Sequence, residues 1–446
     1  LIEKSAAMVG KLEEAGKVPA ADEFTDALNA IAQAVLKKVA TFRVEVDEEE
    51  TVIEAEVKLG DVEEGELVDA GTRQMLKDIV LMAQELTSIL ENNGVESRIE
   101  PVLHIDACSG SDGVTNVDLS IPSELMMALE EEGIASVTVM TDVAVINIPS
   151  GSIELEKGKD LLVHAEKLDK EQLSDDIKKV VGDNPIYDFS ITVNGENIEF
   201  GKSIQVAVPY TPAENADTEK ITVFYIGKDG VLENVIGVYD EKTGMVIFEA
   251  EHFSQYAIKL NDVRFKDVAD KFWAARYIEV MASKGIIKGV GADMFKPANN
   301  VTRAEFLAMI VREFKLFDKD AQNPFKDVNE TDWFYPEVVS GAKFGIVKGR
   351  PGGVFAPNDK ITREEMATIV SNVLNQILCK KAPDKAEDYL KAYVDSDNIA
   401  NYAKDTVAMA TKYQILSGRP GGIFAPKDNA DRSEAAKVIY MLFYME

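Results

Sequence analysis

The chain contains 446 residues, of which 46% are hydrophobic and 28% charged, a composition that suits two to four globular domains. The formal net charge of −30 is uneven, because residues 1–260 hold 52 acidic and 21 basic residues (net −31), which leaves +1 for the remainder. That balance argues against nucleic-acid binding, which needs a basic face, and the apolar runs are too short to span a membrane. The chain opens Leu1-Ile2-Glu3, without an initiator methionine or a charged-then-apolar leader, so we expect a mature or excised piece of a longer protein.

The first part of the chain is predicted to be an acidic α+β region over residues 1–180. Apolar residues at helical spacing predict its helices, and alternation of apolar and polar residues predicts its strands. In chain order these elements are a helix over 7–39, strands over 41–46 and 51–57, a helix over 70–91, a strand over 115–121, a helix over 123–132 and two strands within 136–148.

A separate β-rich module is predicted over residues 181–261. Nearly all of 186–260 is strand-like, and Asn194-Gly195 and Asp229-Gly230 are typical of hairpin turns. We place a soft domain boundary near residue 180 and a firmer one near 262.

Cysteines and histidines give no metal-binding pattern. Cys108 and Cys379 are far apart, and His104, His164 and His252 are isolated, so no zinc site is expected.

Catalytic and calcium-binding patterns are also missing from the sequence. His252 precedes Phe253-Ser254, but no nucleophile elbow accompanies it, and we interpret it as structural. The acidic runs at 47–50 and 130–132 lack the alternating carboxylate loop of a calcium site, so calcium is left open without the support of a motif. We predict no cofactor and no enzymatic activity.

The C-terminal third contains one sequence pattern three times. Each copy has an aromatic-x-Asp opening, then a glycine followed by Phe-x-Pro, and then an arginine in a Thr-Arg-Ala-Glu-like box. The arginines are 60 and 69 positions apart, with the extra length mostly in a charged linker around 380–391. The openings start at Phe265, Phe325 and Tyr393, the Phe-x-Pro segments at Phe295, Phe355 and Phe424, and the box arginines are Arg303, Arg363 and Arg432.

Each copy predicts two helices joined by a tight turn. The first helices are expected over 275–284, 336–344 and 403–413, ending before Gly285, Gly345 and Gln414. The second helices open with capping boxes headed by Thr302, Thr362 and Asp431. Such short helices cannot bury their apolar faces alone, so the copies (262–322, 323–391 and 392–446) must pack as one all-α unit.

These repeats resemble S-layer homology (SLH) repeats through the Phe-x-Asp opening, the Gly-x-Phe-x-Pro turn and the Thr-Arg-Ala-Glu box. The resemblance covers residues 265–446 and implies a pseudo-threefold helical spindle whose grooves bind secondary cell-wall polysaccharide, usually at a terminal pyruvylated N-acetylmannosamine. It also implies an extracellular place in the cell wall or S-layer, with other surface proteins or further copies of the chain as additional partners.

The resemblance also implies ligand-binding residues, because the family's box arginine meets the ligand carboxylate with help from a tryptophan, an aspartate and turn glycines. An arginine just inside a helix N-terminus would lie beside free amides and the positive end of the helix dipole. Its guanidinium can hold a carboxylate bidentately, and an indole offers an apolar face to a sugar ring. Carried over, the residues are Arg303, Arg363, Arg432, Trp273, Trp333, Tyr402, Asp267, Asp327, Asp395, Gly289, Gly349 and Gly418.

The third copy departs from the family pattern. Its box reads Asp431-Arg432-Ser433-Glu434, and Tyr402 replaces a tryptophan after a one-residue shift. Because Asp431 would set a negative charge beside an anionic ligand, we expect the groove of Arg432 to be weak or silent and this copy to serve mainly as scaffold.

The region upstream of the repeats resembles the acidic α+β and β modules that precede SLH repeats in Firmicute surface proteins, through 206–212, 223–225 and 252–257. This likeness implies no activity. We predict a non-enzymatic protein that is attached non-covalently to wall polysaccharide. Two alternatives stay open: the anchoring fragment of a larger extracellular polysaccharide-degrading enzyme, and an S-layer lattice protein.

Overall fold

The computed structural model describes residues 41–46, 51–59, 97–109 and 113–445 except 199 and 228, together with 77, 80, 81 and 84. Contacts divide the chain into unit 1 (Leu1–Leu260) and unit 2 (Asn261–Glu446). The predicted helix over 7–39 lies outside the described residues, and the one over 70–91 lies almost entirely outside them. Within the described ranges, none of the helices combines the length and apolarity that crossing a membrane requires.

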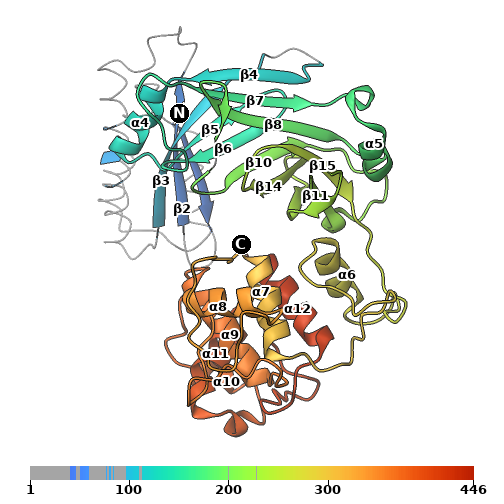
Figure 1. The fold of residues 1–446 in the computed structure, drawn as a ribbon. Helices are drawn as coiled ribbons and strands as arrows, with labels where there is room; N and C mark the ends of the chain where they lie inside the picture. The colour runs from blue at the N-terminus through green and yellow to red at the C-terminus, as the bar shows by residue number, and fades with distance from the viewer. Residues whose placement is uncertain are drawn as a thin grey trace. The chain divides into compact units, whose positions relative to one another are not determined.

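As far as its residues are described, unit 1 is built from two β-sheets (Figure 1). In the first sheet β2, β3 and β5 are parallel neighbours and the other pairs are antiparallel. Its order is β1 (Thr41–Val46), β2 (Thr51–Leu59), β3 (Ser97–Asp106), β5 (Ser136–Met140), β6 (Val145–Pro149), β10 (Ile204–Pro209), β14 (Met245–Ala250) and β13 (Gly237–Asp240). The second is antiparallel, in the order β12 (Leu232–Asn234), β11 (Ile221–Ile226), β15 (Gln255–Leu260), β8 (Ile186–Val193), β7 (Leu161–Lys167) and β4 (Asn116–Ile121), with β9 (Glu196–Asn197) beside β8.

Both sheets of unit 1 contribute to one hydrophobic core. Burial alternates along β10 and β14, so every second side chain points inward. Val206 and Phe248 of the first sheet belong to the same buried cluster as Phe189 and Tyr256 of the second. Helix α4 (Ser123–Glu132) packs into this cluster, so the predicted α+β, mainly-β fold class of the N-terminal region is confirmed.

The predicted boundary near residue 180 is wrong. All seven residues of β7 pair with β8 across it, and β6 pairs with β10. The polar helix α5 (Asp175–Val181) and Gly182 give this segment the composition of a linker, but it connects two neighbouring strands. The hairpin turn at Asn194-Gly195 is confirmed, with both residues at positive φ.

Unit 2 consists of helix pairs, and each second helix begins with a complete capping box, as predicted. The first helices end before Gly285, Gly345 and Gln414, all in left-handed conformation. The pairs are α6 (Ala275–Ser283) with α7 (Arg303–Glu313), α8 (Tyr335–Lys343) with α9 (Arg363–Gln376), and α11 (Lys404–Lys412) with α12 (Arg432–Phe443), while α10 (Glu387–Leu390) lies in the linker.

A closed ring of backbone hydrogen bonds joins the repeats just before the capping residues. The amide of Val301 donates to Ala430 (3.0 Å), that of Ala430 to Ile361 (2.9 Å), and that of Ile361 to Val301 (3.1 Å). Each second helix also packs on the first helix of the next repeat: α7 on α8, α9 on α11 and α12 on α6. Repeats 1, 2 and 3 therefore follow one another in a cycle, with the pseudo-threefold arrangement that the resemblance implies.

Candidate functional site

The box arginines connect neighbouring repeats. Each Nε donates to the phenylalanine carbonyl in the next repeat's turn, at 3.0, 2.7 and 2.8 Å for the pairs Arg303–Phe355, Arg363–Phe424 and Arg432–Phe295. The guanidinium also lies over that ring, 5.1, 5.1 and 4.3 Å from its centroid. Only 3–6% of each arginine is exposed, and burial lowers the pKa of all three. They remain charged at ordinary pH and hold the unit together.

The anion site predicted at the helix N-termini is wrong. In α7 the first two amides donate to the carbonyl oxygens of Asp359 and Pro357 in the next repeat, at 3.0 and 3.1 Å. The third donates to the side chain of Thr302 at 3.1 Å. Helices α9 and α12 use their first amides in the same way. The docking of repeat on repeat thus occupies the donors that an anion would need.

A second arginine, which our interpretation of the sequence missed, lies in two of the turns. Arg350 and Arg419 occupy the second position of Gly-Arg-Pro-Gly-Gly at 349–353 and 418–422, where repeat 1 has Val290. Their side chains are 37% and 38% exposed. Arg350 donates to Glu365 at 2.8 Å, and this bond raises the pKa of the arginine. The presence of Gly-Arg-Pro-Gly-Gly in repeats 2 and 3 and its absence from repeat 1 could have pointed to these arginines in the sequence.

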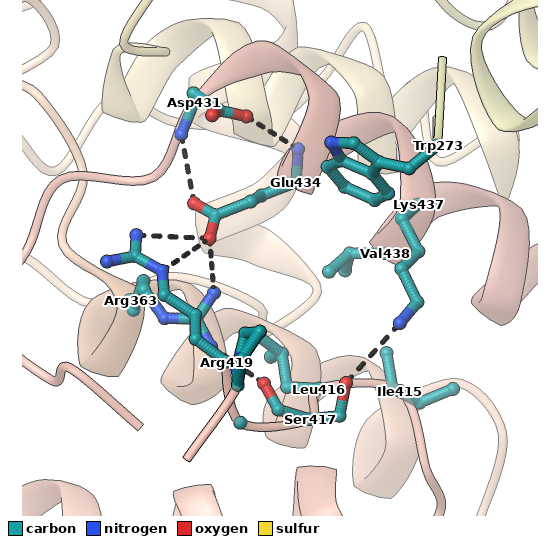
Figure 2. A pocket seen from close by; sticks show the side chains of 12 residues that line it. Trp273, Arg363, Ile415, Leu416, Ser417, Arg419, Asp431, Glu434, Lys437 and Val438 are labelled. Atoms are coloured by element: carbon teal, nitrogen blue, oxygen red, sulfur yellow. Dashed lines mark hydrogen bonds and ion pairs between the residues drawn. The ribbon is translucent and has the colours of Figure 1, made fainter. Parts of the chain in front are cut away.

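Arg363 and Arg419 line a cavity of about 560 Å³, which we call the Arg363 groove (Figure 2). Arg363 comes from repeat 2. It donates to Glu434 and to the carbonyl of Ser417 in repeat 3, both at 2.8 Å. The turn at 417–420 and the first turns of α12 come from repeat 3, and Trp273 comes from repeat 1.

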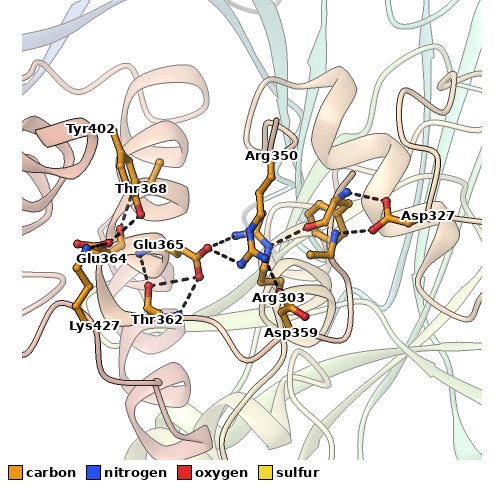
Figure 3. Close-up of polar contacts among 12 residues, drawn as sticks. Arg303, Asp327, Arg350, Asp359, Thr362, Glu364, Glu365, Thr368, Tyr402 and Lys427 are labelled. Atoms are coloured by element: carbon orange, nitrogen blue, oxygen red, sulfur yellow. Dashed lines mark hydrogen bonds and ion pairs between the residues drawn. The ribbon is translucent and has the colours of Figure 1, made fainter. Parts of the chain in front are cut away.

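The Arg303 groove is a cavity of about 580 Å³ with the same design (Figure 3). Arg303 comes from repeat 1, and its Nη1 lies 3.3 Å from a carboxylate oxygen of Glu365. Arg350 and α9 come from repeat 2, and Tyr402 from repeat 3. Each of these two grooves therefore needs all three repeats.

By analogy with these two cavities, the same cyclic order predicts a third ligand site at Arg432, which we call the Arg432 groove. Arg432 donates to the carbonyl of Lys288 in the turn of repeat 1, at 2.7 Å. Trp273 precedes α6, which packs on α12, and Tyr402 precedes α11, which packs on α9. In the same way Trp333 precedes α8, which packs on α7. We therefore assign Trp333 to this groove.

The expectation that Asp431 and Tyr402 weaken the Arg432 groove is wrong, because neither residue lies in that groove. Tyr402 lines the Arg303 groove and Asp431 the Arg363 groove. What distinguishes the Arg432 groove is the turn of repeat 1, in which Val290 replaces the second arginine and Asn299 replaces its aspartate partner, Asp359 or Asp428. Weak binding in this groove stays a prediction, now based on that turn.

The aromatic residues carried over from the resemblance are exposed by 54% (Trp273), 57% (Trp333) and 61% (Tyr402). Tyr402 lies two residues before α11, and each tryptophan likewise lies two residues before its helix. The extra residue of the third copy therefore lies between Tyr393 and Tyr402, and Tyr402 occupies the position of the tryptophans. Its hydroxyl donates to buried Glu364 at 3.0 Å, and burial and this carboxylate raise the pKa of Tyr402. Glu364 also accepts from the amide of Ala400 at 3.1 Å and from Lys427 at 2.5 Å.

Replacing Glu364 by alanine, the residue that α7 carries at this position, should lower the free energy of unfolding of unit 2 by about 2 kcal/mol, because three donors lose their acceptor. Denaturant unfolding followed by tryptophan fluorescence measures it, since both tryptophans lie in unit 2. The matched control is Ser433→Ala in α12, which removes a single bond to Pro297. Equal losses in the two variants would refute this role of Glu364.

The aspartates of the aromatic-x-Asp segments close the turns. Each accepts from two consecutive amides, as Asp327 does from Phe355 and Ala356 at 2.7 Å (Figure 3); Asp267 and Asp395 do the same in their turns. They do not line the Arg303 or Arg363 groove, and we do not propose them as ligand contacts.

Gly349 and Gly418 line the two grooves, and Gly289 is their equivalent. A Cβ at Gly289 would lie 2.7 Å from the Phe265 ring and 2.8 Å from the carbonyl of Met294. The turn glycines are therefore required by packing against the opening aromatic residue.

Unit 2 should lose stability in acid through the turn of repeat 1. Burial acts to raise the pKa of Asp267, but the hydrogen bonds donated by the amides of Phe295 and Lys296 outweigh it and hold the pKa below its usual value. A depressed carboxyl pKa gives stability that is present above the unfolded value and lost as the pH falls through the folded one. The urea concentration at the midpoint of unfolding should decrease as the pH is lowered from about 5 to about 3. The decrease should be smaller in Asp267→Asn. The same dependence on pH in both proteins would contradict this role of Asp267.

A family model described as the S-layer homology domain matches residues 264–307, 324–367 and 392–436. The chain carries three S-layer homology domains. They confirm the predicted repeats, are non-catalytic, and imply anchoring to the cell wall. The predicted extracellular, cell-wall-associated location is also confirmed.

Similar proteins include polysaccharide-degrading enzymes and S-layer proteins. An amylopullulanase of Thermoanaerobacterium thermosulfurigenes is 36% identical over 260 residues (58% of this chain, 14% of that protein). An endoglucanase of Bacillus sp. is 34% identical over 186 residues (42% of this chain, 19% of that protein). The S-layer protein sap of Bacillus anthracis is 30% identical over 176 residues (39% of this chain, 20% of that protein). The chain thus spans at most a fifth of the length of these relatives. The first match is longer than unit 2, so it extends into unit 1.

Proposed function

We propose that unit 2 fastens the protein to its cell wall by binding acidic sugar ends of secondary wall polysaccharide in the Arg303 and Arg363 grooves. Pyruvylated N-acetylmannosamine is the ligand that the resemblance implies. The observation that carries the proposal is that two cavities of similar size each combine a half-exposed arginine with an exposed aromatic ring.

The chemistry of these cavities suits an acidic sugar. A guanidinium has five N–H donors, and Arg350 directs two of its nitrogens to Asp359 and Glu365, which leaves donors for ligand oxygens. The apolar face of Trp273 or Tyr402 can cover the C–H face of a sugar ring. Unit 2 is nearly neutral, whereas unit 1 carries the negative charge of the chain, so an anionic glycan meets less repulsion at unit 2.

As a second candidate, for the protein as a whole, we propose that the cargo attached in this way is a polysaccharide-degrading enzyme. The match to an amylopullulanase, which includes part of unit 1, favours this cargo. An S-layer lattice is the alternative that the match to the S-layer protein sap suggests. Ordered two-dimensional arrays formed by the purified chain would favour the lattice.

Calorimetric titration of the full chain with pyruvylated N-acetylmannosamine tests the binding proposal. We expect two sites per chain and much weaker binding of N-acetylmannosamine without the acid group. Equal affinity for the acidic and the neutral sugar, or no binding of either, would refute the proposal.

A further inference from the structure

The arginines of the Arg363 groove are already neutralised by carboxylates. Arg363 and Arg419 share Glu434, at 2.8 and 3.1 Å, and Arg419 also pairs with Asp428 at 2.5 Å. Asp431 adds a further carboxylate to the lining of this cavity. Arg419 is partly exposed and still offers N–H donors to a ligand, but the net charge of the two arginines is already balanced.

Lys437 is the remaining cation among the residues that line the Arg363 groove. It extends from α12 beside Trp273, and its ammonium donates to the hydroxyl of Ser417 at 3.3 Å (Figure 2). Within the described part of the chain, no carboxylate pairs with it. Its charge is therefore available to a ligand.

The Arg303 groove also has a lysine, but on the turn. Lys348 precedes Gly349, lines the cavity and is exposed, and no carboxylate among the described residues pairs with it. Repeat 1 has Lys288 at the same turn position, whereas repeat 3 has Ser417.

In repeat 3 the lysine is missing from the turn and is present on the second helix instead. Three residues after the capping-box glutamate, α7 and α9 carry Ala308 and Thr368, whereas α12 carries Lys437. Repeat 3 thus lacks the turn lysine and has a lysine on the facing helix instead. The contact of Lys437 with Ser417 brings its ammonium to the turn position from which the lysine is missing.

We propose that Lys437 is the cation that contacts the acid group of the glycan in the Arg363 groove, in the role that Lys348 has in the Arg303 groove. The inference rests on the proposed function and names the residue that recognises the ligand's charge. An ammonium has three donors on a flexible stem, so it can meet a carboxylate from the helix as well as from the turn. The two grooves then recognise the same chemistry with lysines from different elements.

The test uses the full chain with Trp333→Phe, so that Trp273 fluorescence reports on the Arg363 groove alone. Pyruvylated N-acetylmannosamine is titrated against this protein, against Lys437→Thr, which copies Thr368, and against Ser417→Lys with Lys437→Thr, which copies the Arg303 groove. Lys437→Thr should weaken binding about tenfold to a hundredfold, the cost of one charge-assisted bond. The double exchange should restore most of the affinity.

Neutral N-acetylmannosamine is the comparison ligand, and Lys437→Thr should weaken its binding much less than that of the acidic sugar. Unaltered affinity of Lys437→Thr for the acidic sugar would overturn the role of Lys437 but leave the proposed function intact, and so would failure of the double exchange to restore binding. No response of the starting protein to the acidic sugar would overturn both. Lys437→Gln, which keeps the stem and removes the charge, should bind as weakly as Lys437→Thr, and binding at full strength by this variant would also count against the role.

Discussion

Replacing Arg363 by alanine should lower the free energy of unfolding of unit 2 by about 3–5 kcal/mol. The side chain is 4% exposed and donates to the carbonyls of Phe424 and Ser417 and to Glu434. Its removal leaves two carbonyls without this donor, takes one cation from Glu434 and opens a cavity between repeats 2 and 3. Denaturant unfolding of the full chain, followed by tryptophan fluorescence, gives the value.

Arg264→Ala is the control for this prediction, because Arg264 is 58% exposed and pairs with Asp262 and Asp270 at the surface. Because both of its ion pairs are screened by solvent, its loss should leave the free energy of unfolding nearly unchanged. Similar small effects of both variants would contradict the connecting role of the box arginines. If the prediction holds, a loss of wall binding by Arg363→Ala or by Arg432→Ala reflects damaged folding and does not show whether the grooves differ.

The second large effect concerns binding. Giving both turns the residues of repeat 1, by Arg350→Val with Asp359→Asn and Arg419→Val with Asp428→Asn, should weaken wall binding about a hundredfold or more. Each groove loses a donor worth about tenfold, and a chain held at two points also loses the benefit of simultaneous engagement. Cosedimentation with purified cell-wall sacculi measures the affinity.

The fold itself provides the controls for this second prediction. Because repeat 1 carries Val290 and Asn299 in the same turn, the exchanged turns should fold, with stability close to that of the parent. The reverse graft, Val290→Arg with Asn299→Asp, should strengthen wall binding by completing the Arg432 groove. A variant with both turns exchanged that sediments as well as the parent would show that the second arginines take no part.

Features that depend on nearby residues could be predicted from the sequence. The capping boxes of α7, α9 and α12 rest on side chains three positions apart, and the strands of unit 1 rest on alternation. The soft boundary at residue 180 failed because strand pairing depends on partners distant in the chain, such as β6 and β10.

The composition of the grooves could not be predicted from one copy at a time. Tyr402 was paired with Arg432 because both belong to the third copy, yet it lies in the groove of Arg303. Which turn meets which arginine is decided by the cyclic docking of the repeats, set by the ring of Val301, Ile361 and Ala430. The buried state of the box arginines follows from the same docking.

Sedimentation of the full chain with its own sacculi, before and after the secondary polysaccharide is removed, tests wall anchoring most directly. The chain should sediment with intact sacculi, stay in solution once the polysaccharide is gone, and be released from intact sacculi by pyruvylated N-acetylmannosamine. Undiminished binding to stripped sacculi would contradict the account.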